Sequence, residues 1–224
     1  MNENGEAQRV AIIAGASGLV GSAVLQLLLQ SEDYKRVIAL VRRPLEVNHP
    51  KLEQITVAFT ALPELPAFAG AEVFCALGTT MKLAGSRAAF RAVDYAAALA
   101  FAKSAADGGA RQFVLVSSIG AKAQSTTFYL QVKGELEDAL KTLPFQAVHI
   151  FRPSFLVGDR VDARPVERVG GAVAKALEFA FVGKLKKYSA IEVSVLATAI
   201  LAARAAEPGV HIYEYEQILA LAKS

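Results

Sequence analysis

A seven-residue loop with three glycines, Gly15-Ala-Ser-Gly18-Leu-Val-Gly21, joins a short apolar run to an amphipathic segment. The run Arg9–Ala14 has the composition of a buried strand, and Leu19–Ser31 repeats apolar residues at helical spacing. Glycines here allow a tight turn and a close approach of phosphate to the backbone, and the helix start offers unpaired amide N–H groups to an anion. The order of strand, loop and helix therefore predicts a dinucleotide-binding site. A Walker-type loop is disfavoured because no Gly-Lys-Ser/Thr follows.

The rest of the chain alternates short apolar runs with longer helical patterns. Such alternation, with strands that are apolar almost throughout, is typical of a doubly wound, mostly parallel α/β sheet, the Rossmann fold. At 224 residues the chain fits a single domain spanning 1–224, with about 154–190 forming a small C-terminal lobe on the substrate side. The expected strands are Arg9–Ala14, Arg36–Val41, Ile55–Phe59, Glu72–Leu77, Gln112–Ser117, Gln146–Arg152 and His211–Tyr215. The expected helices are Leu19–Ser31, Arg87–Ala106, Phe128–Thr142, Val166–Phe181 and Val195–Ala206.

Charge and cysteine content narrow the classes of partner. The 24 basic and 21 acidic residues leave a net charge of only +3, so we expect no nucleic-acid partner. Cys75 is the only cysteine; we expect a buried structural thiol, no metal site and a reducing, cytoplasmic location. The start Met1–Gln8 lacks the pattern of a secretory signal. The uncharged stretch Val10–Gln30 is long enough to span a membrane, but its small residues favour a soluble strand and helix, so no membrane partner is expected.

Two arginines, Arg42 and Arg43, follow the second expected strand. NAD-preferring proteins of this fold usually have an acidic residue there to hold the ribose hydroxyls. An arginine at the same edge can instead pair with the 2′-phosphate of NADP and stack on the adenine. The pair therefore favours NADP(H), and the alternative is a solvated pair at the start of a loop.

A tyrosine and a lysine, Tyr129 and Lys133, lie four residues apart on one face of an expected helix. A free phenol is a poor acid or base at neutral pH, and a nearby ammonium stabilises its phenolate form. Ser117 and Ser118 end the preceding strand and can present a hydroxyl to the same substrate oxygen. We assign the catalytic roles to Ser118, Tyr129 and Lys133, although Ser117 is nearly as good a choice as Ser118 and both serines could merely cap the strand.

These motifs resemble those of an atypical short-chain dehydrogenase/reductase, and more closely those of the Tat-interacting-protein oxidoreductase family. The segments that carry the resemblance are Gly15-Ala-Ser-Gly18, Arg42-Arg43, Cys75-Ala-Leu-Gly-Thr-Thr80, Ser117-Ser118, Tyr129-Leu-Gln-Val-Lys-Gly-Glu135 and Phe151-Arg-Pro153 with Asp159-Arg160. The resemblance implies NADPH bound at the glycine loop and at the two arginines. It also implies contacts from Leu77 and Gly78 at a strand end, from Leu156, and from Arg164 reaching back from a loop. The complete expected cofactor set is Gly15, Ser17, Gly18, Leu19, Val20, Gly21, Arg42, Arg43, Leu77, Gly78, Tyr129, Lys133, Leu156 and Arg164.

Two positions depart from better-known patterns. Leu19-Val20 stands where animal members of the family carry a polar pair, which matters little if backbone N–H groups bind the phosphate. Asp94 stands near the position at which many related reductases anchor a proton-relay water with an asparagine. Because the resembling family shares the aspartate, the usual relay is not expected to carry over.

The sequence thus predicts an NADP-dependent oxidoreductase acting on a small carbonyl or alcohol substrate. The main alternative is a non-catalytic NADPH sensor that acts through a protein partner. A third hypothesis, an epimerase or dehydratase of sugar nucleotides, is weakened by the short region after Pro153, because such substrates need a larger lobe.

Overall fold

Seven parallel strands form one sheet in the order β3-β2-β1-β4-β5-β6-β9. The computed structural model describes residues 9–60, 62, 68–158, 189–205 and 207–224. Strand order reverses at β1, from which the chain runs outward in both directions, as in a doubly wound fold. The strands are β1 (Arg9–Ala14), β2 (Tyr34–Val41), β3 (Leu52–Thr56), β4 (Glu72–Cys75), β5 (Gln112–Val116), β6 (Ala147–Phe151) and β9 (Gly209–Tyr213).

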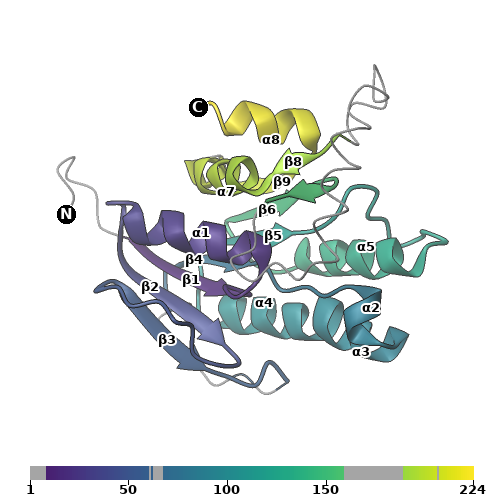
Figure 1. Cartoon of the computed structure of the whole chain (residues 1–224), viewed down its shortest axis with the longest axis horizontal. Helices are drawn as coiled ribbons and strands as arrows, with labels where there is room; N and C mark the ends of the chain where they lie inside the picture. Colours follow the sequence, from purple (N-terminus) through teal and green to yellow (C-terminus); the bar gives the residue numbers. More distant parts are fainter. Residues whose placement is uncertain (1–8, 61, 63–67, 159–188, 206) are drawn as a thin grey trace.

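Helices cover both faces of the sheet (Figure 1). On one face α1 (Leu19–Gln30), α7 (Val193–Ala202) and α8 (Tyr215–Leu221) share an apolar core with the strands. On the other face α4 (Ala98–Asp107) and α5 (Phe128–Leu140) form a second core. The central strands are buried on both faces, which explains why their sequences are apolar almost throughout. The shorter helical elements are α2 (Met81–Ala84), α3 (Arg87–Arg91), the π-helix η2 (Ala92–Ala97) and the 3₁₀ turn η5 (Ala203–Ala205).

The structure confirms the predicted doubly wound sheet and corrects several element bounds. The third strand is Leu52–Thr56 rather than Ile55–Phe59. It is an edge strand whose residues are at most half-buried, so it carries few apolar residues. The more apolar run at 55–59 therefore gave the stronger strand signal. Helix α8 and the small pair β7 (Leu156–Val157) and β8 (Ile191–Glu192) were not predicted. The expected helix Val166–Phe181 and most of the expected lobe lie outside the described residues.

The uncharged stretch near the start of the chain divides into β1, the glycine loop and the 12-residue helix α1. Within the residues that the structure describes, no helix has the length and apolar character needed to cross a bilayer.

Because every strand of the sheet runs in the same direction, the carboxyl ends meet at one edge. The residues that follow β1, β2, β4, β5 and β6 include Gly15, Arg42, Leu77, Ser117 and Arg152 respectively. The fold therefore gathers most of the predicted site residues at this edge, where doubly wound proteins bind ligands.

Candidate active site

The glycine loop is packed too closely for side chains at two of its positions. Gly15 has φ +87°, and a Cβ on it would lie 2.4 Å from the Ala76 carbonyl oxygen. A Cβ on Gly21 would lie 2.1 Å from the carbonyl oxygen of Gly15. The amide of Gly18 donates a hydrogen bond of 2.9 Å to that same oxygen, closing the turn. These contacts explain why glycine occupies the loop, which holds the end of β1 directly against the start of α1.

The amino end of α1 has the features of an anion site. Gly18 is the residue before the helix and has no side chain to cap the first turn. Leu19 is half-buried and Val20 is buried, so a ligand would meet backbone N–H groups rather than these two apolar side chains. The side chain of Ser17 is exposed. The uncapped helix start and the close glycine packing fit the phosphates of a dinucleotide.

Arg42 and Arg43 are exposed directly after β2, which pairs with β1 up to Ala14 and Leu40. The pair is thus one strand away from the glycine loop on the same edge of the sheet. This placement is the one that the NADP hypothesis requires. The choice between NAD and NADP stays a prediction.

The ammonium of Lys133 is buried and paired with a carboxylate. Its side chain is 6% exposed, and its Nζ lies 2.8 Å from Oδ1 of Asp94, which is 1% exposed. The other oxygen of Asp94 accepts a hydrogen bond of 2.8 Å from the amide of Thr79. Burial alone lowers the pKa of Lys133, but the negative charge of Asp94, and that of Tyr129 when it is ionised, raise the pKa above its ordinary value. Lys133 is therefore an ammonium at neutral pH.

The Asp94 carboxylate ties Lys133 to the loop after β4. Gly78 lies over the ion pair, since a Cβ on it would be 3.4 Å from Asp94 Oδ1 and 3.7 Å from Lys133 Nζ. Leu77 and Gly78, both in the expected cofactor set, are thus next to the expected catalytic lysine. The structure brings these parts of the prediction together.

Asp94 lies in a π-helix, η2, which separates α3 from α4. Such wide turns are rare, and many occur at functional sites. One turn earlier, the buried ring of Phe90 packs against the ring of Tyr129 at a centroid distance of 5.5 Å. Phe90 and Asp94 are four residues apart, as are Tyr129 and Lys133 on the facing helix α5. Phe90 contacts the predicted tyrosine and Asp94 pairs with the predicted lysine, so the two contacts hold both residues.

The two serines after β5 have different environments. Ser117 is buried and its hydroxyl donates a 2.5 Å hydrogen bond to Oε1 of Glu137. Ser118 is half-buried in the following loop, and no side-chain hydrogen bond from it is found in the described structure. The Ser117 hydroxyl is engaged within the protein, which favours Ser118 as the group that faces a substrate.

The loop after β5 also packs tightly on α5. A Cβ on Gly134 would lie 2.2 Å from the carbonyl carbon of Lys122, and the amide of Lys122 donates to the carbonyl oxygen of Leu130 at 3.2 Å. The glycine after Lys133 therefore lets the serine-bearing loop approach the tyrosine-bearing helix.

The remaining expected cofactor residues fall into two groups. Leu156 lies in β7, and Gly158 shortly after it is close to the glycine loop, since a Cβ on Gly158 would be 3.7 Å from Leu19 Cδ1. Arg164 lies outside the described residues.

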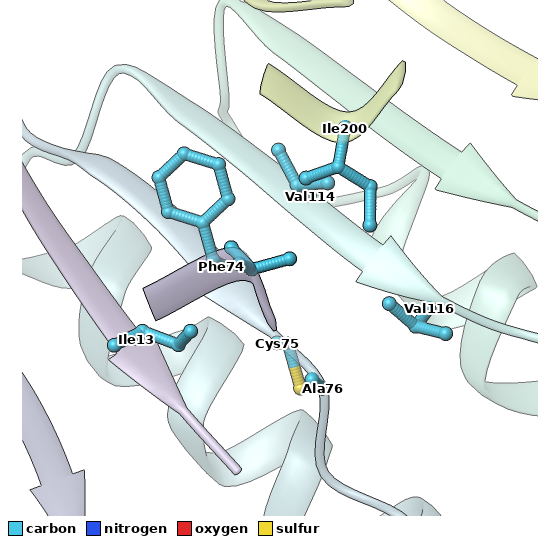
Figure 2. Close-up of a pocket in the computed structure, with 8 residues that line it drawn as sticks. Ile13, Phe74, Cys75, Ala76, Val114, Val116 and Ile200 are labelled. Atoms are coloured by element: carbon cyan, nitrogen blue, oxygen red, sulfur yellow. The ribbon is translucent and has the colours of Figure 1, made fainter. Parts of the chain in front are cut away.

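A small apolar cavity lies beneath the carboxyl edge, between the sheet and the helices α1 and α7 (Figure 2). Its volume is about 10 Å³, barely the space of one water, so it cannot hold a substrate. It is lined by Ile13, Val24, Phe74, Cys75, Ala76, Val114, Val116 and Ile200. Cys75 is buried as expected, and burial raises the pKa of its thiol to about 11, so it is not a nucleophile at neutral pH.

Sequence reasoning missed the partners of the predicted residues. Asp94 was noted only as a departure from a related pattern, and Glu137 and Arg152 received no role. A signal existed for Glu137, because it follows Lys133 by four residues and so lies on the same face of the helix.

Comparisons with known proteins agree with this geometry. Residues 15–171 match the family model described as NAD(P)H-binding. The chain is 40% identical over 154 residues to the protein FMP52-1, mitochondrial, of Scheffersomyces stipitis, covering 67% of this chain and 68% of that protein. It is 41% identical over 160 residues to the protein HTATIP2 of Rattus norvegicus, covering 69% of this chain and 66% of that protein. The matched region thus spans about two thirds of each relative.

Solved structures share the fold. The UDP-glucose 4-epimerase of Thermotoga maritima, determined with UDP-glucose, has a TM-score of 0.65 at 15% identity, covering 96% of this chain and 81% of that one. MoeE5 in complex with UDP-glucose and NAD has a TM-score of 0.67 at 14% identity, covering 95% of this chain and 80% of that one. At such low identities the likeness concerns the fold alone.

The name of the yeast relative refers to mitochondria, so a cytoplasmic location stays a prediction. By its glycine loop, its sheet order and these matches, the chain belongs to the NAD(P)H-binding family and is related to the atypical short-chain dehydrogenases/reductases.

Proposed function

We propose that this protein is an NADPH-dependent oxidoreductase that acts on a small carbonyl or alcohol substrate. The observation that carries the proposal is the buried pair of Lys133 and Asp94, one helical turn from Tyr129 and directly under the loop of Leu77 and Gly78. A buried ion pair is expensive to keep in the absence of a role that needs a charge at that place.

The residues present fit the cofactor. Backbone amides of the glycine loop and of the first turn of α1 would hold the pyrophosphate, and Arg42 and Arg43 would hold the 2′-phosphate. Lys133 would bind the nicotinamide ribose. When bound, NADPH supplies the hydride for reduction of a carbonyl, or NADP accepts one from an alcohol.

The side chains of the protein would manage the proton and the substrate oxygen. In the reductive direction Tyr129 donates its phenolic proton to the oxygen of the former carbonyl while Ser118 holds that oxygen by a hydrogen bond. The nearby ammonium of Lys133 stabilises the phenolate that remains. Asp94 keeps Lys133 charged and in place, and Phe90 restricts the ring of Tyr129.

The first experiment measures cofactor binding by the shift in melting temperature with NADPH and with NADH. A panel of small aldehydes and ketones is then tested for oxidation of NADPH by the wild type, by Tyr129→Phe and by Tyr215→Phe. Tyr215 begins α8, which packs on the face of the sheet opposite α5, and serves as a matched control for loss of a phenolic hydroxyl. We expect turnover in the wild type and the control, and loss of turnover in Tyr129→Phe with NADPH binding intact.

Two other outcomes would each reject part of the proposal. NADPH binding without any Tyr129-dependent turnover would favour the alternative, a cofactor sensor that acts through a protein partner. Failure of both dinucleotides to raise the melting temperature would reject the binding site itself.

A further inference from the structure

A second buried carboxylate, Glu137, lies on α5 one turn after Lys133 and joins the ends of two strands. Its side chain is 1% exposed. Its Oε1 accepts hydrogen bonds from the Ser117 hydroxyl at 2.5 Å and from Arg152 Nε at 3.1 Å. Its Oε2 accepts from Arg152 Nη2 at 2.5 Å. Both carboxylate oxygens are therefore held by donors from two neighbouring strands.

The donors of this network lie at the carboxyl edge of the sheet. Ser117 follows β5 and directly precedes Ser118, and Arg152 follows β6. Arg152 also reaches the start of α8, where its Nη1 lies 3.5 Å from Oε1 of Glu214. The network thus connects α5, the ends of β5 and β6, and the helix after β9.

Main-chain bonds extend the sheet through the same residues. The Ser117 amide donates to the Phe151 carbonyl oxygen at 2.7 Å, and the Ile119 amide donates to the Pro153 carbonyl oxygen at 2.9 Å. The residues immediately before and after Ser118 are therefore both hydrogen-bonded to the segment that ends β6. The Glu137 carboxylate links this segment to α5 by accepting the hydrogen bond of the Ser117 hydroxyl.

The chemistry of the network indicates a role beyond packing. Arg152 is partly buried and Glu137 is fully buried, and such an ion pair is seldom more stabilising than apolar residues of the same volume. Stability alone therefore does not explain the charges here. Directional bonds instead fix orientation, and Glu137 shares a helix face with Tyr129 and Lys133 while it holds the neighbour of Ser118.

We propose that Glu137, acting through Ser117 and Arg152, is a positioning residue that sets Ser118 relative to the catalytic face of α5. The proposal rests on the function proposed above. Glu137 touches neither substrate nor cofactor in this role; it fixes the separation of two groups, Ser118 and Tyr129, that must meet one substrate oxygen.

The opposite edge of the sheet provides a matched control. Glu72, at the start of β4, is 2% exposed, and its Oε2 accepts a 2.5 Å hydrogen bond from the hydroxyl of Tyr34. It is thus a buried carboxylate of the same kind, at the amino ends of the strands and away from the site. Glu72→Gln and Glu137→Gln make the same chemical change at the two edges.

The test compares these two variants with the wild type for kcat and KM with the best substrate of the carbonyl panel, and for NADPH affinity and melting temperature. For Glu137→Gln we expect kcat to fall roughly 10- to 100-fold, with KM and the NADPH Kd within about twofold of the wild type. Glu72→Gln is expected to lose stability and to keep kcat within about twofold. Equal kcat in all three proteins, or an equal fall in both variants, would overturn the proposal.

Two additions keep the test decisive. If Glu137→Gln does not fold, Ser117→Ala removes one arm of the network and is expected to lower kcat roughly 3- to 10-fold. Absence of turnover in the wild type rejects the proposed function, and hydrogen exchange then decides the positioning role. In that case the amides of residues 117–119 must exchange faster in Glu137→Gln and not in Glu72→Gln; unchanged exchange would reject it.

Discussion

Replacing Asp94 by alanine tests whether Lys133 is a buried ammonium that depends on one carboxylate. With both side chains under 10% exposed, solvent does not screen the pair, and removal of one partner of such a pair typically costs about 3–5 kcal/mol. Lys133 can limit this cost by losing its proton. The penalty is then about 1.4 kcal/mol for each pH unit between the measuring pH and its ordinary pKa of 10.5.

This limit gives the destabilisation a definite pH dependence. At pH 7 a neutral Lys133 costs roughly 5 kcal/mol, and at pH 9 roughly 2 kcal/mol. The destabilisation decreases as pH rises because the unfolded chain keeps Lys133 protonated below pH 10.5, whereas the folded variant does not. Folding of the variant must therefore remove a proton, and this costs less at higher pH. Loss of the hydrogen bond to the Thr79 amide adds about 1 kcal/mol at either pH.

The assay is urea unfolding of the wild type and Asp94→Ala at pH 7 and pH 9. The double variant Asp94→Ala, Lys133→Met removes the unpaired charge and is expected to recover most of the stability at pH 7. A loss below about 1 kcal/mol at pH 7, the same loss at both pH values, or a double variant no more stable than the single one would contradict this reasoning.

Three further predictions concern other parts of the molecule. Gly21→Ala places a Cβ 2.1 Å from the Gly15 carbonyl oxygen, so urea unfolding should show a loss of roughly 1–3 kcal/mol and titration a weaker NADPH affinity; a variant as stable and as tight-binding as the wild type would rule out the packed loop. Arg42→Ala with Arg43→Ala should weaken NADPH binding much more than NADH binding in a calorimetric titration, and equal weakening would contradict the 2′-phosphate assignment. Burial lowers the pKa of His149 from 6.5 to about 4, so the folded state stays neutral while the unfolded state gains a proton, and stability falls by up to roughly 3 kcal/mol as pH drops from 6.5 to 4. His149→Asn should lessen this fall in pH-dependent melting, and an unchanged slope would refute the linkage.

The sequence by itself determined the elements whose patterns are local. The glycine loop with its flanking strand and helix, and the spacing of Tyr129 and Lys133, could be located because backbone conformation and side-chain periodicity depend on neighbouring residues. β1 was predicted with its observed bounds, and α1 with a single extra residue at its end. The family resemblance came from the same short motifs.

The tertiary structure decided which distant residues meet. Asp94 pairs with Lys133 across 39 positions, and Ser117 rather than Ser118 is held by Glu137, yet no local pattern distinguishes these choices. Edge strand β3 was misplaced because a half-buried strand has a weak apolar signal. Partners across a sheet or between helices are set by strand order, register and the packing of whole elements, and these arise only when the chain has folded.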